Sequence, residues 1–257
     1  MALALRRRPK KQLPEKNRPT WLFRMRKFFY HGGKVLFFKY PGFTLQDLAA
    51  VQDSVDGPSF TLAAQRMWDH PVGRRLMIEQ PEITLDSVDW RALSMLPIDS
   101  LGYNFWHHMY TNGILQDVDF SNPVVKWDED TEYAKKRYRE THDIRHVVLG
   151  LSITGPEEAI LQSFQCSQLY QHLSLGIMTL GALKFALSEG SILRMLRDEP
   201  RAWRVGKEAR FLSNVYYEHL WERPVAEVRE MLNITPIGDR YPVKERHPDA
   251  PWERPSE

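Results

Sequence analysis

The segment from Asp128 to Gly150 carries the strongest helix signal in the chain. Three consecutive acidic residues open it, where negative charge favours the positive end of the helix dipole, and a glycine closes it. Comparable start and stop signals recur between residues 20 and 232, whereas no two segments combine strand alternation with a hairpin turn. The sequence therefore predicts an all-α fold, built as a single helical domain.

The predicted helical domain covers residues 20–235 and lies between two tails. Residues 1–19 are basic and contain proline, which predicts a disordered segment, and residues 236–257 are proline-rich, which predicts an extended one. Ten Lys or Arg and one Glu give residues 1–27 a charge of +9, so the total of +2 leaves −7 for the other 230 residues. A basic arm of this kind binds an anionic partner, either nucleic acid or a membrane surface.

The first predicted helix favours the membrane over nucleic acid. Thr20 can cap a helix that Gly32 and Gly33 end, and one set of apolar side chains falls within about 120° of arc on it. Basic residues flank this arc, as at a membrane interface. The alternative is a basic helix docked on the protein body. The expected membrane contacts are Trp21, Leu22, Met25, Phe28 and Phe29.

The cysteine count and the lengths of the apolar stretches exclude several classes of protein. The single cysteine, Cys166, rules out an intramolecular disulfide and cysteine-rich zinc sites, and it suits a reducing compartment. No apolar stretch reaches the roughly 20 residues of a membrane-spanning helix. The longest, from Leu173 to Leu183, indicates a buried or interfacial helix that bends near Gly176 or Gly181.

His142, Asp143 and His146 form the clearest chemical pattern in the sequence. The two histidines are four residues apart on a predicted helix, so both side chains project from one face. Asp143 lies within about 100° of each of them. A divalent metal ion requires such convergence, because every ligand atom must lie about 2 Å from the ion. The same pattern also allows two histidines with only a structural role.

A fourth ligand is expected from the next helix, because the short connection 151–155 folds that helix back. If Thr154 caps it, Glu157 serves as the capping glutamate, and Glu158 remains free to reach the metal. Glu157 stays open as the rival ligand. His107 and His108 are discounted, because adjacent helical residues point about 100° apart and do not easily share one metal.

The motif resembles the signature of the coenzyme Q biosynthesis protein 4 family. The stretch Arg137-Tyr-Arg-Glu-Thr-His-Asp-Ile-Arg-His146 is followed by eleven residues and then Glu158. Residues 96–102, read as Leu-Pro-x-x-Ser-Leu-Gly, and residues 216–222, read as Tyr-Tyr-Glu-x-x-Trp-Glu, also resemble family segments, the second expected to be helical. The resemblance covers roughly residues 35–235. The loop 152–156 differs from the family's Pro-Thr-containing loop.

The resemblance implies a zinc site made of His142, Asp143, His146 and Glu158 between two consecutive helices. It also implies oxidative decarboxylation in ubiquinone biosynthesis, in which a hydroxyl replaces the carboxyl at ring carbon one of a polyprenylated hydroxybenzoate. Asp143 is the residue that we expect to be catalytic. Zinc has no redox chemistry, so either the metal is a Lewis acid while the ring reacts with dioxygen, or another divalent ion such as Fe(II) is the native one.

The resemblance implies partners and a location as well. The expected partners are the prenylated aromatic precursor, a membrane surface and other quinone-biosynthesis proteins, with room for a homo-oligomer and no nucleic acid. The expected location is peripheral, on the inner face of a bacterial cytoplasmic membrane or the matrix face of the mitochondrial inner membrane. The alternative function is a non-catalytic scaffold or prenyl-lipid carrier with a structural metal. A metal phosphohydrolase of the His-Asp type ranks below both.

Small and apolar residues after the motif suit a tunnel for the prenyl tail. The alternative is a core helix that glycines make thin for close packing. The residues expected to line the tunnel are Leu173, Gly176, Ile177, Leu180 and Gly181.

Overall fold

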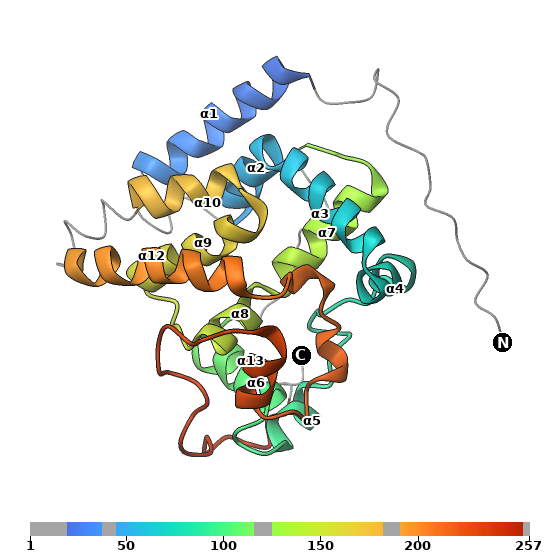
Figure 1. The fold of residues 1–257 in the computed structure, drawn as a ribbon, viewed down its shortest axis with the longest axis vertical. Helices are drawn as coiled ribbons and strands as arrows, with labels where there is room; N and C mark the ends of the chain where they lie inside the picture. Colours follow the sequence, from blue (N-terminus) through green and yellow to red (C-terminus); the bar gives the residue numbers. More distant parts are fainter. Residues whose placement is uncertain (1–19, 38–44, 116–124, 182–190, 254–257) are drawn as a thin grey trace. The chain divides into compact units, whose positions relative to one another are not determined.

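The computed structural model describes residues 20–37, 45–115, 125–181 and 191–253, and its regular elements are helices (Figure 1). Extended pairing among these residues is limited to one isolated bridge between Ser100 and Pro224. The prediction of an all-α fold is therefore confirmed. The predicted disordered tail, residues 1–19, lies outside the described residues. No helix in the described ranges is both long and apolar enough to cross a bilayer.

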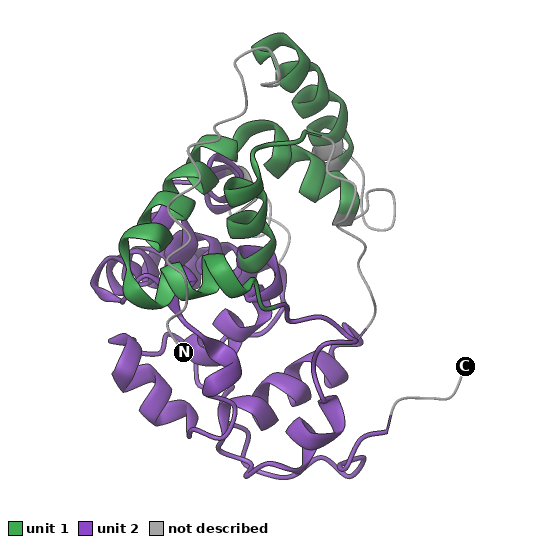
Figure 2. Ribbon diagram, turned by 90° about the vertical axis from the view of Figure 1, so that its right-hand side faces the viewer, with its two compact units in different colours: residues 1–81, 118–137 green, residues 82–117, 138–257 purple. Residues whose placement is uncertain are grey.

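The chain divides into two compact units, residues 1–81 with 118–137 and residues 82–117 with 138–257 (Figure 2). In the first unit, α1 packs against α2 through polar contacts. Arg24 Nε donates to Ser54 O at 2.7 Å, and Asp47 Oδ1 pairs with His31 Nδ1 at 2.8 Å and Lys34 Nζ at 3.1 Å. The helices of this unit are α1 (Trp21–Phe37), α2 (Leu45–Val55), α3 (Gly57–Asp69), α4 (Pro71–Glu79) and most of α7 (Glu129–Glu140).

The second unit holds the larger core, in which α9 and α12 lie very close. A Cβ placed on Gly206 of α12 would lie 2.6 Å from the backbone oxygen of Phe164 on α9, so only glycine permits this approach. The elements of this unit are α5 (Trp90–Met95), α6 (Leu101–Thr111), α8 (His142–Leu149), α9 (Gly155–Leu169), α10 (His172–Gly176), the π-helix η2 (Ile177–Gly181), α12 (Ile192–Glu208), the 3₁₀ turns η3 (Leu212–Asn214) and η4 (Tyr217–His219), and α13 (Val225–Leu232).

The helix predicted from Asp128 to Gly150 is interrupted at Thr141, between α7 and α8. The buried Arg145 guanidinium donates to Tyr138 O and to Thr141 Oγ1, at 3.1 Å in each case. The first of these bonds satisfies the Tyr138 carbonyl, which a continuous helix would pair with a backbone N–H one turn on. The predicted end at Gly150 is confirmed, because this residue has the left-handed φ of 76°.

One other helix limit differs from the prediction: α1 continues through the glycine pair expected to end it, where Gly32 lies against Val51 of α2. α9 ends at Leu169, because Tyr170 adopts a left-handed conformation (φ 50°). α12 continues through Pro200, because its buried face packs on α9.

Residues 216–222, expected to be helical, form only the 3₁₀ turn η4, and a second 3₁₀ turn, η3, precedes it after α12. Tertiary hydrogen bonds replace helical ones there: Gly102 N–H donates to Trp221 O at 2.8 Å, and Leu212 N–H donates to Gln168 Oε1 at 3.2 Å. Local propensity therefore gives way to packing.

The C-terminal segment (residues 236–253) is non-helical and lies packed on the second unit. Tyr241 is only 2% exposed. Val243 N–H donates to Asn104 Oδ1 at 2.8 Å, and Trp252 N–H donates to Ser94 Oγ at 2.9 Å. This segment therefore belongs to the core that surrounds α6.

Candidate metal centre

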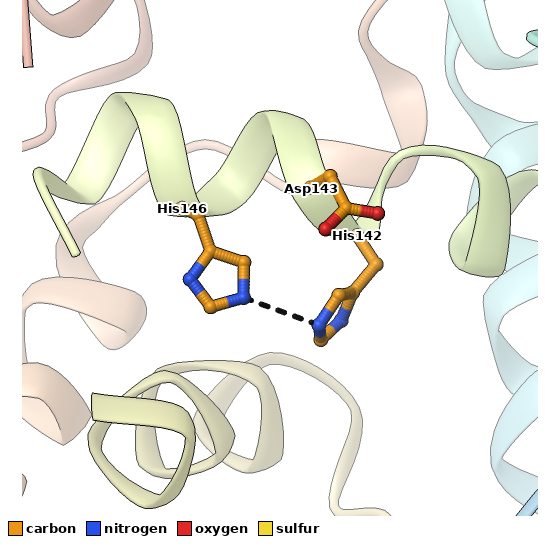
Figure 3. Close-up of side chains that lie close together, drawn as sticks. All are labelled: His142, Asp143 and His146. Atoms are coloured by element: carbon orange, nitrogen blue, oxygen red, sulfur yellow. Dashed lines mark hydrogen bonds between the residues drawn. The ribbon is translucent and has the colours of Figure 1, made fainter. Parts of the chain in front are cut away.

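His142 and His146 lie one turn apart on α8 and direct their imidazole rings toward each other (Figure 3). Their Nε2 atoms are 3.3 Å apart. Asp143 lies on the same turn, and one ligand atom from each of the three residues falls within 4.8 Å of the others. The structure thus brings together the three α8 residues that the motif predicts.

Glu158 reaches this group from the first turn of α9. Its Oε1 lies 3.0 Å from His146 Nε2 and 3.6 Å from His142 Nε2. Glu157 is directed elsewhere, because its carboxylate accepts from Ser152 N–H and pairs with Arg194. The Thr154 side chain makes no capping hydrogen bond, and Glu157 accepts from the backbone N–H of Ser152 rather than from that of Thr154. The expected capping box is therefore not formed.

The donor set fits a divalent metal ion. Two imidazole nitrogens and a carboxylate oxygen lie 3.0–3.6 Å from one another, and the ligand atoms of a tetrahedral site with bonds of about 2.05 Å are about 3.3 Å apart. The mixed nitrogen and oxygen donors suit zinc or Fe(II). His146 is fully buried, whereas the His142, Asp143 and Glu158 side chains are 21–30% exposed. The group is thus partly open on one side.

The charges of these residues are strongly coupled. Burial opposes ionisation of Glu158, but His146 and His142 hold the pKa of its carboxyl well below the ordinary range. Burial likewise disfavours the charged form of His146, and Glu158 nevertheless raises the pKa of its imidazole. A metal ion held by these residues would displace a proton, because an imidazole must be neutral to act as a ligand.

Two residues that the motif does not contain also contact this group. His108, discounted from the sequence, places its Nε2 3.3 Å from Asp143 Oδ1, and its ring stacks on His146 with centroids 5.1 Å apart. Burial lowers the pKa of His108, which favours the neutral ring. The adjacent His107 contacts His247 instead. The two histidines thus face different neighbours, and His108 contacts the candidate ligands without being one of the predicted ligands.

Gln165 is the second such residue, and it contacts the outer nitrogen of His142. Gln165 Nε2 lies 3.1 Å from His142 Nδ1, and Gln165 Oε1 lies 2.5 Å from the Tyr138 hydroxyl. That hydroxyl also faces Gln171 Oε1 and has only one proton to donate. Turning the Gln165 carboxamide over lets its oxygen accept from His142 Nδ1–H, which leaves the Nε2 lone pair free for a metal.

The predicted membrane contacts lie on α1 with unequal exposure. Trp21, Leu22 and Phe29 are 69%, 73% and 71% exposed, whereas Met25 and Phe28 are half-buried. Two aromatic residues that were not predicted, Phe23 and Tyr30, are also exposed. Thr20 Oγ1 accepts from Phe23 N–H at 3.3 Å, as expected of a cap.

The predicted tunnel residues fall on α10 and η2. Leu173 and Ile177 are half-buried, nothing lies within 4 Å of a Cβ built on Gly176, and the side chain of Leu180 lies outside the described structure. The predicted bend falls in the π-helix that begins after Gly176. The surroundings of Gly181 and the residues that follow it, 182–190, lie outside the described structure. The tunnel therefore stays a prediction.

Comparison with known proteins gives a consistent result. Residues 43–238 match the model of a family described as "Coenzyme Q (ubiquinone) biosynthesis protein Coq4". The chain is 31% identical over 190 residues to ubiquinone biosynthesis protein COQ4 homolog 1, mitochondrial, of Culex quinquefasciatus, covering 73% of this chain and 67% of that protein. It is 32% identical over 194 residues to the Bos taurus homolog, covering 74% and 71%.

One solved structure has the same fold. It is a putative ubiquinone biosynthesis protein from Nostoc punctiforme PCC 73102, with a TM-score of 0.61 and 22% identity over 82% of this chain and 94% of that one. The family match covers the candidate metal ligands on α8 and α9. The chain belongs to the Coq4 family of coenzyme Q (ubiquinone) biosynthesis proteins.

Proposed function

We propose that this ubiquinone-biosynthesis protein catalyses the oxidative decarboxylation of a polyprenylated hydroxybenzoate at a divalent metal centre. The ring loses its carboxyl as carbon dioxide and gains a hydroxyl at the same carbon, a two-electron oxidation that consumes one dioxygen and one water and releases one hydrogen peroxide. The proposed ligands are His142, Asp143, His146 and Glu158.

The partial exposure of the donor set is the observation that carries this proposal. A structural metal site has every position filled by protein, whereas a catalytic site keeps one position for water or substrate. Here His146 is fully buried, and the other three side chains retain 21–30% exposure. A ring carboxylate can therefore approach from the exposed side.

The residues of the centre have distinct roles in this proposal. Zinc, the first candidate, would act as a Lewis acid toward the ring oxygens, and Fe(II) would add redox chemistry. Burial opposes ionisation of Asp143, but the His108 hydrogen bond and the charges of the neighbouring histidines together lower the pKa of its carboxyl, so the carboxylate is ionised. That carboxylate accepts a hydrogen bond from the ring hydroxyl, which makes the ring more electron-rich toward dioxygen.

The prenyl tail and the location complete the proposal. The tail lies along α10 and η2, and α1 contacts the membrane with its exposed aromatic side chains. The relatives from Culex quinquefasciatus and Bos taurus are named as mitochondrial. A peripheral location on the matrix face of the inner membrane, or on the inner face of a bacterial membrane, suits these features, and other quinone-biosynthesis proteins are the proposed partners.

Asp143→Asn tests catalysis, because it nearly preserves shape while removing the charge. The purified variant should stay folded and lose the ability to remove the ring carboxyl. Metal analysis should give about one divalent ion per wild-type chain, much less in His146→Ala, and the wild-type amount in Glu157→Ala. Extraction of the wild-type protein should yield a prenylated aromatic lipid.

The scaffold alternative predicts different results. A structural metal contributes folding free energy, so Asp143→Asn would then unfold or lose several degrees of thermal stability. Full quinone production by folded Asp143→Asn and His146→Ala proteins in a deletion strain would rule out catalysis at this centre. Retention of metal in His146→Ala would rule out the ligand set itself.

A further inference from the structure

A tyrosine of the C-terminal segment lies behind the candidate metal centre, on the side away from solvent. Tyr241 is 2% exposed, and its hydroxyl lies 2.8 Å from Nδ1 of His108, whose side chain is fully buried. Three separate parts of the second unit therefore meet at His108: α6, the start of α8 and the C-terminal segment.

The hydrogen-bonding groups of these three residues form a directional chain. The Asp143 carboxylate can only accept, so the His108 nitrogen that faces it at 3.3 Å, Nε2, carries the hydrogen. In the neutral ring, Nδ1 is then an acceptor, and the Tyr241 hydroxyl is the donor that satisfies it. Tyr241 thus selects the tautomer of His108 that can donate to Asp143.

The stacking of His108 on His146 adds a geometric constraint. The two rings are tilted by only 22°, with centroids 5.1 Å apart. His108 therefore contacts two of the proposed ligands: its Nε2 faces Asp143, and the face of its ring lies against His146. Residues that hold ligands in this way orient them, and their loss typically weakens metal binding about 10–100-fold.

We propose that His108 is a positioning residue that orients the Asp143 carboxylate, and that Tyr241 fixes His108 in the tautomer this role requires. The inference rests on the proposed metal site. Tyr241 lies beyond residues 43–238, which match the family, so the C-terminal segment adds an outer layer to the centre that the family match does not include.

Cobalt(II) titration of the full-length protein tests this role, because the visible spectrum of bound cobalt reports the ligand arrangement. His108→Phe keeps an aromatic ring against His146 and removes the donor to Asp143. It should bind cobalt(II) about 10–100-fold more weakly and shift the cobalt bands. His108→Gln places a carboxamide N–H near the position of Nε2 and should restore most of the affinity. Tyr241→Phe should change affinity in the same direction as His108→Phe, by less.

Matched controls come from the same helix. His107→Phe changes the neighbouring histidine, which contacts His247, and Tyr110→Phe removes a hydroxyl that donates to Asp249 of the C-terminal segment at 2.7 Å. Both controls should bind cobalt(II) with wild-type affinity and spectrum. Thermal unfolding of each metal-free variant separates loss of stability from loss of orientation.

The outcomes distinguish this inference from the proposed function. Wild-type affinity and spectrum in both His108→Phe and Tyr241→Phe would overturn the positioning role alone. If X-ray absorption finds fewer nitrogen ligands on cobalt(II) in His108→Phe than in the wild type, His108 is a direct ligand, and the positioning role is overturned too. Failure of the wild-type chain to bind cobalt(II) or zinc would overturn both the metal site and this inference. If His108→Phe does not fold, Tyr241→Phe and Tyr110→Phe are compared instead. Equal cobalt(II) affinity in these two variants would overturn the positioning role, and weaker binding in Tyr241→Phe alone would support it.

Discussion

At the scale of single residues, the candidate centre depends on the outer nitrogens of its histidines as much as on the ligand atoms. A histidine binds a metal through one nitrogen, and the hydrogen bond at the other nitrogen determines its tautomer and ring orientation. His142 has such a partner in Gln165, which Tyr138 holds in turn. Among the described residues His146 Nδ1 has no hydrogen-bond partner, and the His146 ring stacks on His108.

Gln165→Leu should therefore weaken zinc binding about 10–100-fold, because His142 loses the partner that orients it. Gln165→Glu should keep or strengthen binding, since a carboxylate accepts from His142 Nδ1–H without having to turn over. Competition with a chromophoric chelator measures both affinities. Gln162→Leu is the control, because Gln162 lies on the same helix and bonds Ser174 instead. Equal affinity in Gln165→Leu and Gln162→Leu would contradict the orienting role.

At the scale of elements, α8 and α9 form a hairpin that places three ligands on one helix and the fourth on the next. Gly150 allows the tight turn, because its φ of 76° is strained for any residue with a side chain. A Cβ there would also lie 2.3 Å from Gly238 O in the C-terminal segment. The connection that brings Glu158 to His146 is thus also a contact with the end of the chain.

α1 carries the prediction about membrane contact. Trp21→Ala combined with Phe29→Ala removes two side chains that are 69% and 71% exposed, so it should leave the fold unchanged. Burying each aromatic side chain in a bilayer interface contributes on the order of 1.5–3 kcal/mol, so vesicle affinity should fall at least tenfold. Sedimentation with vesicles containing anionic lipid measures the loss.

Met95→Ala is the matched control, because Met95 is 60% exposed on α5, a different helix. Binding of the wild-type chain should also weaken as salt rises, since exposed charges are screened beyond about 8 Å at physiological ionic strength. An unchanged affinity in the double variant would show that α1 does not contact the membrane.

At the scale of the whole molecule, the second compact unit contains all the candidate ligands and the two residues outside the motif that contact them, His108 and Gln165. That unit is made of two stretches of sequence, 82–117 and 138–257. Within it, Arg229 of α13 forms hydrogen bonds with both α8 and the C-terminal segment. The Arg229 guanidinium donates to Val148 O at 2.8 Å and Val147 O at 3.2 Å at the end of α8, and to Tyr241 O at 2.8 Å. It thereby satisfies carbonyls that the helix leaves free and holds the residue that contacts His108.

Arg229→Met should lower the free energy of unfolding by about 5 kcal/mol, because three hydrogen bonds from a charged group are lost and each contributes about 1.5–3 kcal/mol. Thermal unfolding of the metal-free protein measures this loss, because the melting temperature of a chain of this size falls by about 2–4 °C for each kcal/mol. Arg223→Met is the control, since Arg223 is 55% exposed and pairs only with Glu227 one turn on. Similar melting temperatures for the two variants would contradict this role.

The sequence by itself determined the helical class, many helix boundaries and the convergence of His142, Asp143 and His146. These features depend on local physics: the 3.6-residue period places residues four apart on one face, and caps act within one turn. The sequence favoured Glu158 but left Glu157 open, and the structure directs Glu157 to Ser152 and Arg194 and places Glu158 beside His146.

Only the tertiary structure decided which distant residues surround the ligands. His108 lies 35 residues before Asp143, and Tyr241 lies 133 residues after His108, so no periodicity relates them. Their meeting depends on how α6 and the C-terminal segment pack against α8. The 3₁₀ turns after α12 have the same origin, because hydrogen bonds with distant groups there replace those of a regular helix.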